Sequence, residues 1–402
     1  MKYPFFKSFG PAWIVMIADV DVASIVTGIQ SGVSFGYHLI FIEIILTVPL
    51  AVIQYVSGTV AIHTGKGIAE NIRTGWGKQY AYASALPMAV TDFLSYAAEY
   101  SGIAIGFELL GMSPVLGILL AFIFHNMVIL SRRFERVEFP LILISFVLVA
   151  TFAVIAFASR PDPSLIVSHG LTPIQPYGNH SYLYLAVANI GAVVMPWMIF
   201  YQAGANVEKS VRSDHSRVHR LETIIGALVS ELIMCAIIVA AAGLSIRDGS
   251  SVEGILAAFG TLGSGYQVLM AIGFISAGFL ALVVISLSSA WGVCEAAGIK
   301  FRFSSRISER KGFYLIFLLE SFPAMLLSLY SSSDLITLLI SLMVIYVVVD
   351  IPVLTMVGLI ARRNRIVEKG LLSRTTISLY WIFFMAIELT GFYSISVNGI
   401  QL

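Results

Sequence analysis

GPAWIVMIADVDVASIVTGIQSG, residues Gly10–Gly32, is the stretch from which the rest of the chain can be interpreted. It has the length and apolar composition of a membrane helix, yet its centre carries the carboxylates of Asp19 and Asp21 and the hydroxyl of Ser24. An ionisable side chain at that depth costs roughly 2.5–3.5 kcal/mol or more, so it is expected to face a cavity, a partner or an ion. We therefore predict an interrupted first membrane helix whose acids line a polar site.

The composition of the whole chain is that of a membrane protein with many spans. Of 402 residues, 58% are hydrophobic and 12% are charged, and the mean hydropathy is +0.90. About 20 apolar residues cross a bilayer as a helix, and runs of that length are too long for barrel strands. Eleven such segments can be placed, at residues 12–31, 39–62, 80–108, 114–131, 138–158, 182–206, 221–245, 267–294, 313–330, 335–361 and 376–397. We predict an all-α protein with one membrane domain over residues 1–402 and no room for an enzyme domain.

The basic residues predict the orientation of these segments. Of the 24 Lys and Arg residues, only Arg160 and Arg247 fall on the side opposite the N-terminus. Loops rich in Lys and Arg stay in the cytoplasm, so the N-terminus is predicted to be cytoplasmic and the C-terminus external. A short chain without long tails suits the inner membrane of a prokaryote, and no nucleic-acid partner is expected.

The sixth segment contains a second interruption. A glycine and Pro196 lie in its middle, and a proline removes a backbone donor and clashes with the preceding turn, so we expect a break between Ala192 and Pro196. Breaks in the first and sixth helices are typical of two inverted five-helix repeats, here about 10–158 and 182–361, with the eleventh helix, 376–397, outside them. Such folds bind substrate at mid-membrane, where the broken helices face each other. Since one chain supplies both repeats, we expect a functional monomer in the lipid bilayer.

The charged residues inside the predicted segments are all acidic. They are Asp19, Asp21, Glu43, Asp92, Glu99, Glu108, Glu231, Glu320, Asp350 and Glu388, with Glu138 and Glu222 at segment edges. Without a basic partner in the membrane, each of them must be protonated or meet a cation. We therefore expect a cationic substrate, since an anion or a zwitterion would lack a positive side chain to bind.

The residues at the two breaks form a mixed set of ligands. Asp21 would supply a charged oxygen and Ser24 a hydroxyl. The second break would supply backbone carbonyls near Ala192 and the thioether of Met195. Mg²⁺ and Ca²⁺ prefer oxygen, whereas sulfur is a soft donor that suits transition ions. The set indicates Mn²⁺ or Fe²⁺, and the alternative is that Met195 is only a packing residue.

Six short motifs, in this order, resemble the NRAMP family of divalent metal transporters. They are Gly10-Pro11, Asp21 in the unwound turn, Gly36-Tyr37, Thr64-Gly65-Lys66, Ala98-Glu99 and Val194-Met195-Pro196. The resemblance covers the first six helices by motif and the rest by topology, and it implies the leucine-transporter-like fold. It also places the family's metal-binding turn on Asp21-Val22-Ala23-Ser24, and its alanine carbonyl and methionine sulfur on Ala192 and Met195.

Three positions depart from the family pattern. Tyr96, Trp197 and Gln202 stand where the resemblance implies an acid and two histidines that are associated with proton coupling. This puts coupling by the usual route in doubt, so transport is either uncoupled or uses other polar residues. The candidates for a proton or polar relay are Glu99, Asp19, Asp92, His125 and Asp350. For His125, a role as a hydrogen-bonded packing residue is the alternative.

Other features resemble the NRAMP-related magnesium transporters. These features are Ala18-Asp19-Val20-Asp21, Pro196-Trp197 and Phe200-Tyr201-Gln202. The resemblance implies oxygen ligands for a partly hydrated ion, and that branch usually lacks the methionine. Met195 is therefore the residue that divides the two interpretations.

The sequence thus predicts a transporter, not an enzyme, that imports divalent metal by alternating access as a symporter or a uniporter. Mn²⁺ is the first expected ion and Fe²⁺ the second, and the alternative is an uncoupled Mg²⁺ transporter. More distant alternatives are a sodium-coupled organic-solute carrier of the same fold and a membrane sensor that does not transport. No cofactor is expected besides the transported ion. Cys235 and Cys294 lie in membrane segments and are predicted to be free thiols.

Overall fold

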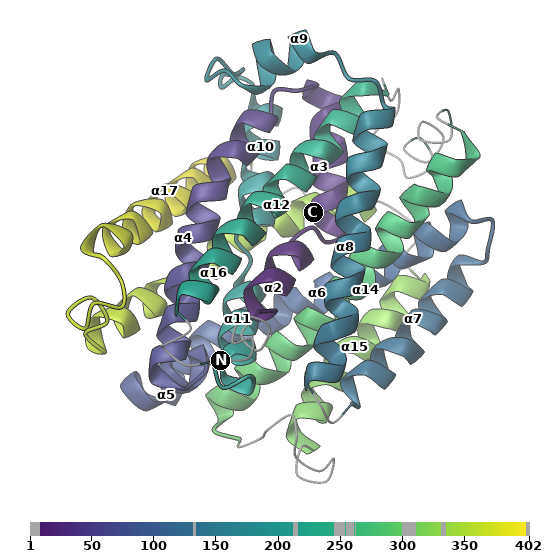
Figure 1. The fold of residues 1–402 in the computed structure, drawn as a ribbon. Coiled ribbons are helices and arrows are strands. Elements are labelled where there is room, and N and C mark those ends of the chain that lie inside the picture. The colour runs from purple at the N-terminus through teal and green to yellow at the C-terminus, as the bar shows by residue number, and fades with distance from the viewer. Residues whose placement is uncertain are drawn as a thin grey trace, which may run out of the picture.

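The computed structural model describes residues 9–131, 134–211, 216–244, 254, 261, 263–299, 311–330 and 335–398, which form helices and no strand (Figure 1). The helices in chain order are α2 (Pro11–Ala18), α3 (Val22–Phe35), α4 (Ile40–Thr64), α5 (Ile68–Trp76), α6 (Lys78–Leu109), α7 (Pro114–Ile129), α8 (Phe134–Ala158), α9 (Pro163–Leu165), the π-helical turn η1 (Ile166–Gly170), α10 (His180–Val193), α11 (Pro196–Glu208), α12 (Ser216–Gly243), α14 (Ser264–Ala297), α15 (Lys311–Tyr330), α16 (Leu335–Arg363) and α17 (Arg374–Asn398). Each predicted segment coincides with one helix or with a pair of helices separated by a short break, so the all-α prediction is confirmed.

Most of these helices have the length and composition of membrane spans. In the described part of the chain, eight segments are long and apolar enough to cross a membrane when α10 and α11 are counted together as one, and the bent pair α2–α3 makes a ninth span. The other two predicted spans are α7, which has 16 residues, and α6, which has 32 residues but mixes polar and acidic side chains into its sequence. The chain is an integral membrane protein, and the total of eleven spans stays a prediction.

The first interruption lies where the sequence predicted it. α2 ends at Ala18, α3 begins at Val22, and their axes differ in direction by 48°. Asp21 has an extended backbone, with φ −81° and ψ 180°, and its side chain caps α3. An aspartate at this position satisfies one of the amides that the first turn of a helix leaves without a partner.

The second interruption separates α10 from α11. Val194 and Met195 are extended, with φ and ψ of −123° and 94° for the first and −108° and 142° for the second. Pro196 is the first residue of α11, a position where its fixed φ fits and its missing N–H is not needed. The predicted break between Ala192 and Pro196 is therefore confirmed.

The broken helices lie in the interior of the bundle (Figure 1). Every residue of α2 is buried, and α2 packs against α11 and α12. α3 packs against α10 and α12, while α6 and α14 form an extensive contact beside them. Large apolar side chains are exposed on α7, α8, α15 and α17, where lipid tails would cover them. The first break is thus packed among other helices, away from the surface that faces lipid.

Two glycines let neighbouring helices approach the breaks closely. A Cβ at Gly191 of α10 would lie 1.8 Å from the carbonyl oxygen of Met343 in α16. A Cβ at Gly102 of α6 would lie 2.1 Å from a methyl carbon of Val22, the first residue of α3. Small residues are a common means of close packing between membrane helices. In this protein the two glycines allow α16 to pack closely against α10, and α6 against the start of α3.

The loop between α8 and α10 is tied to the turn that precedes α4. His38 Nδ1 donates to Gln175 Oε1 at 2.8 Å, and the His38 and His169 rings stack with centroids 4.5 Å apart. Gln175 Nε2 also donates to the His169 carbonyl at 2.8 Å. At the start of α9 the hydroxyl and the amide of Ser164 donate to Asp162, and these bonds lower the pKa of its carboxyl.

Gly191→Ala tests the close contact between α10 and α16. The added methyl group cannot fit without moving the backbone of Met343, and overpacking of this kind costs about 1–3 kcal/mol. We therefore expect a lower apparent melting temperature in detergent. Gly265→Ala is the matched control, because a Cβ at that helical position meets no atom within 4 Å. Equal melting temperatures for the two variants would contradict the close packing.

Candidate metal site at the two helix breaks

Asp21 uses one carboxylate oxygen to begin α3 and leaves the other one free. Its Oδ1 accepts a hydrogen bond from the Ser24 amide at 2.7 Å. Its Oδ2 is buried without a hydrogen-bond partner, and the whole residue is buried. A buried carboxylate oxygen without a donor is energetically costly. This oxygen is therefore the atom of the first break that is best suited to meet a cation.

Ser24 and Glu99 complete the first break. The Ser24 hydroxyl donates to the Asp19 carbonyl at 2.8 Å, and its oxygen keeps lone pairs that can bind a cation. From α6, Glu99 Oε2 accepts from the Val22 amide at 3.2 Å, while Oε1 is buried without a partner. Glu99 thus lies at the same interruption as the predicted metal ligands.

Tyr346 of α16 is a neighbour of these acids that sequence reasoning missed. Its hydroxyl is hydrogen-bonded to the Ser95 hydroxyl of α6. It also lies close enough to Asp92, Asp21 and Glu99 to interact with them electrostatically. A tyrosine in an apolar run is typical of a core, so the sequence offers no signal for it.

At the second break a proline leaves the Ala192 carbonyl without its usual helical donor. That donor would be the amide of residue 196, and Pro196 has none. Met195 is fully buried and is the N-cap residue of α11, where its side chain makes no capping hydrogen bond. This break therefore combines a carbonyl oxygen that lacks its helical donor with a buried methionine.

The helices on either side of the two breaks pack against one another. α10 packs on α3, and α11 packs on α2. Asn189 Nδ2 donates to Ser31 Oγ at 2.9 Å, which links α10 directly to α3. Within the described residues no group of three or more His, Cys, Asp and Glu side chains could hold a metal, and both cysteines are free, as predicted. A metal at the breaks would therefore need hydroxyl, carbonyl and thioether donors in addition to Asp21.

His125 forms hydrogen bonds through both ring nitrogens. Nδ1 is bonded to the Tyr100 hydroxyl at 2.9 Å and Nε2 to the Ser286 hydroxyl at 2.6 Å. The ring also packs edge-on against Phe317, with centroids 5.0 Å apart. These contacts favour the packing role of His125 over a role in a relay.

Two other relay candidates are directed toward different helices. Asp19 lies in the unwound turn, and its Oδ2 accepts from the Ser230 hydroxyl of α12 at 3.0 Å. Asp350 of α16 interacts electrostatically with Glu388 of α17. These contacts link Asp19 to α12 and Asp350 to α17, and the role of the candidates in a relay stays a prediction.

The three positions that depart from the family pattern are all fully buried. They are Tyr96, Trp197 and Gln202. Gln202 Nε2 donates to Thr223 Oγ1 at 3.4 Å, and the Trp197 indole N–H has no hydrogen-bond partner. None of these side chains takes up a proton near neutral pH.

Glu222 of α12 fastens the beginning of α2. Its Oε1 accepts from the Gly10 amide at 2.6 Å and from the Trp13 amide at 2.8 Å. A carboxylate at a helix N-terminus satisfies free amides and is attracted by the helix dipole. Gly10 has φ 136°, and a Cβ there would lie 1.9 Å from Glu138 Oε1, so no other residue fits at this position.

Lys209 provides a basic partner that sequence reasoning did not find. Its Nζ donates to the Phe9 carbonyl at 2.6 Å and to the two carboxylate oxygens of Glu138 at 2.8 and 2.9 Å. The expectation that the membrane acids lack a basic partner is therefore wrong for Glu138. Lys209 lies just beyond its predicted segment, but its long stem carries the ammonium back to a site where the two side chains are 7% and 8% exposed.

The architecture places the chain in the class of helical membrane proteins that are built around two broken helices. Its fold is similar to that of a manganese transporter from Eremococcus coleocola in complex with an aromatic bis-isothiourea compound, with TM-score 0.78 and 16% identity over 98% of this chain and 87% of that one. It is also similar to a Na⁺-coupled sialic acid symporter, with TM-score 0.65 and 12% identity over 100% of this chain and 94% of that one. These likenesses show the fold alone, and they confirm the predicted leucine-transporter-like fold.

The chain belongs to the Nramp family, whose members are described as natural resistance-associated macrophage protein-like, because the family's sequence model matches residues 12–396. One relative is the divalent metal cation transporter MntH of Verminephrobacter eiseniae, which is 26% identical over 289 residues. That match covers 70% of this chain and 64% of the relative, so the chain spans just under two thirds of the relative's length. The NRAMP resemblance seen in the sequence is thereby confirmed.

Glu138→Gln tests the ion pair beside the start of α2. The substitution leaves the Lys209 ammonium without its anion in a nearly buried place, and breaking such a pair costs about 3–5 kcal/mol. We expect a clear fall in the apparent melting temperature, and a partial recovery when Lys209→Met is added. Glu368→Gln is the control, because its pair with Arg365 is exposed and should contribute little. If both Glu→Gln variants have the same apparent melting temperature as the parent protein, the buried pair does not stabilise the fold.

Proposed function

We propose that this chain transports divalent metal ions and holds the ion between its two helix breaks. The observation that carries the proposal is Asp21 Oδ2, a buried carboxylate oxygen without a hydrogen-bond partner in the middle of an interrupted membrane helix. The Ser24 hydroxyl, the Ala192 carbonyl and the Met195 thioether complete the ligand set. Membership of the Nramp family and the name of the MntH relative, a divalent metal cation transporter, support this substrate class.

Mn²⁺ is the proposed first substrate and Fe²⁺ the second. A set of one carboxylate, neutral oxygens and a thioether is softer than the oxygen sites that Mg²⁺ and Ca²⁺ prefer. Met195 is fully buried at the break, and its sulfur is the proposed soft ligand. The similar fold from Eremococcus coleocola is that of a manganese transporter, which is consistent with the same ion.

Transport would occur by alternating access of two inverted repeats around this site. The repeats are proposed to cover residues 10–158 and 182–361, with α17 outside them. The excess of Lys and Arg near the start of α2 supports a cytoplasmic N-terminus and an external C-terminus. A single chain contains both repeats, which supports a functional monomer in a prokaryotic inner membrane. Opening toward the cytoplasm would then require the bonds from Glu222 and Lys209 to the start of α2 to break.

The polar surroundings favour transport without the family's usual proton route. The three departing positions offer no group that titrates near neutral pH, and both nitrogens of His125 are already bonded. Glu99, beside Asp21, is the proposed polar relay. The same observations favour an uncoupled Mg²⁺ transporter as the second candidate function, in which Met195 would serve only for packing.

A sodium-coupled organic-solute carrier is a weaker candidate, although the fold is similar to that of the sialic acid symporter. An organic acid would need a positive group at the breaks. In the described residues Asp21 brings a carboxylate to the first break, and neither break contains a Lys or Arg residue. The site is therefore better suited to a cation.

Asp21→Asn tests the central ligand. The amide keeps the oxygen that caps α3 but removes the charge, so the fold should persist while metal binding is lost. Mutation of a residue that only hydrogen-bonds to a metal ligand lowers metal affinity or activity by about 10–100-fold. For the ligand itself we expect Mn²⁺ uptake into proteoliposomes to fall by at least about 100-fold. Asp162→Asn is the matched control, because Asp162 caps α9 in the same way but lies in an exposed loop. Retained uptake by a monodisperse Asp21→Asn protein would remove Asp21 from the site.

Met195→Ala tests the role of sulfur in ion selection. If the thioether is a ligand, the variant should lose about tenfold or more in affinity for Mn²⁺ and Cd²⁺ and much less for Mg²⁺. Met198→Ala is the matched control, since Met198 is equally buried on the same helix but lies beyond the break. An equal loss for all three ions would assign Met195 to packing and favour the Mg²⁺ transporter.

Proteoliposomes of the parent chain distinguish the two ions and the coupling in one assay. We expect Mn²⁺ uptake at micromolar concentration to survive about a thousandfold excess of Mg²⁺, with no change of internal pH. Suppression of Mn²⁺ uptake by Mg²⁺, with Mg²⁺ itself entering, would favour the second candidate function. Acidification during uptake would show that a relay other than the usual one carries protons.

A further inference from the structure

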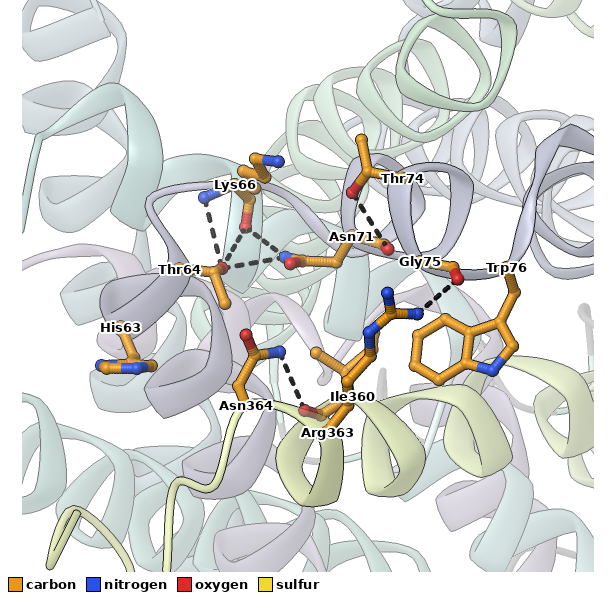
Figure 2. Close-up of a pocket in the computed structure, with 10 residues that line it drawn as sticks. All are labelled: His63, Thr64, Lys66, Asn71, Thr74, Gly75, Trp76, Ile360, Arg363 and Asn364. Carbon is orange, nitrogen blue, oxygen red and sulfur yellow. Dashed lines mark hydrogen bonds between the residues drawn. The ribbon is translucent and has the colours of Figure 1, made fainter.

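A polar pocket lies at the end of the bundle where the α4–α5 connection meets the last turn of α16 (Figure 2). Its volume is about 190 Å³. One ordered water needs roughly 10–15 Å³, so a polyatomic ligand fits inside it. No residue of the proposed metal site lines this pocket, which makes it a separate site.

The lining of the pocket carries positive charge and no negative charge. Lys66 and Arg363 contribute the cations, and none of the ten lining residues is Asp or Glu. Lys369 lies beside the pocket, with its Nζ 3.0 Å from Nε2 of the lining residue His63. A concave site lined by one sign of charge concentrates the electrostatic potential and attracts counter-ions. The pocket is therefore suited to an anion.

Arg363 is held in an orientation that suits an oxyanion. Its guanidinium lies 5.0 Å from the centre of the Trp76 ring, and its Nη1 donates to the Gly75 carbonyl (Figure 2). A guanidinium has five N–H donors, so most of them remain after this bond. Its planar fork matches the oxygens of a phosphate or carboxylate group in pairs.

Asn71 fixes the turn that carries Lys66, the second cation of the pocket. Its side chain is buried, and Nδ2 donates to Thr64 Oγ1, to the Lys66 carbonyl and to the Gly67 carbonyl at 2.9, 3.0 and 2.9 Å. These bonds define the turn between α4 and α5 and hold the backbone of Lys66 at the pocket (Figure 2). The wall of the pocket is thus built by hydrogen bonds before any ligand arrives.

We propose that this pocket binds the phosphate group of an anionic ligand, with Arg363 as the paired donor and Lys66 as the second cation. The pocket lies at the ends of the membrane helices α4 and α16, and Trp76 is a residue type that collects at membrane interfaces. Basic pockets at the cytoplasmic ends of membrane helices bind anionic headgroups. An anionic phospholipid is therefore the favoured source of the phosphate, and a soluble phosphate the alternative. The inference uses the orientation proposed above but does not depend on metal transport.

A ligand at this site would connect two distant parts of the chain. Lys66 belongs to the turn between α4 and α5, whereas Arg363 is the last residue of α16. α5 and α16 already contact each other, so a phosphate bound by both cations would strengthen that contact. Binding is therefore expected to stabilise the protein.

The test is a titration of the purified full-length protein in an uncharged detergent, with the apparent melting temperature as the readout. Phosphatidylglycerol, phosphatidylcholine and, at constant ionic strength, inorganic phosphate are added in separate series. We expect stabilisation by phosphatidylglycerol and none by phosphatidylcholine. Lys66→Gln and Arg363→Gln should each shift the midpoint of the phosphatidylglycerol titration by about fivefold. Lys78→Gln, an exposed lysine at the start of α6 outside the pocket, should behave as the parent.

The separate series distinguish the two sources of phosphate. Stabilisation by phosphatidylglycerol alone assigns a lipid headgroup, and stabilisation by inorganic phosphate with the same sensitivity to both variants assigns a soluble anion. The proposal is wrong if neither ligand stabilises the parent, or if both variants respond as the parent does. Arg363→Gln also loses the contacts to Trp76 and Gly75, so Lys66→Gln decides the outcome if that variant does not fold.

Discussion

Backbone groups in the middle of a membrane must find their partners within the protein, and this constraint governs the centre of the molecule. A helix can stop at that depth only if side chains replace the missing partners. At the first break Asp21 accepts from the amide of Ser24, Glu99 accepts from the amide of Val22, and the Ser24 hydroxyl donates to the Asp19 carbonyl. The same carboxylates each retain one buried oxygen without a partner. The requirement for a stable break and the chemistry proposed for the site are therefore met by the same side chains.

The short helix α2 connects this centre to a second set of buried contacts at its N-terminal end. It has eight residues, all of them buried, and it is held at both ends. At one end lies the unwound turn, and at the other Glu222 binds the first amides while Lys209 binds the Phe9 carbonyl. A displacement of α2 would disturb both ends together. The packing of α2 thus links the proposed ion site to the buried contacts at the start of this helix.

The sequence predicted both breaks because each leaves a local mark, a pair of carboxylates in one apolar run and Pro196 in another. The chemistry proposed for the site rests on the same residues. The position of Tyr346 beside the acids and the capping of α2 by Glu222 were not predicted, because both depend on which helices pack together. Glu222 lies 212 residues along the chain from the Gly10 amide that it binds. The partner of Glu138 was missed for another reason. A segment predicted from hydropathy ends with its last apolar residue. The flexible side chain of Lys209, just after that end, extends back along the helix and reaches Glu138.

Pro196 and Ala192 have a consequence for any genetic study of this protein. The proposed ligand at position 192 is a main-chain oxygen, and it is left without a helical donor by a residue four positions away. Exchanging the side chain at 192 for another small one leaves that oxygen in place, so a scan of side chains would classify the position as unimportant. Replacing Pro196 restores an amide that can engage the same oxygen, although the proline ring need not touch an ion at all. At this break the stronger phenotype is thus expected at Pro196, which is not itself a ligand, while the main-chain oxygen of Ala192 that would bind the ion is not removed by any substitution of its side chain.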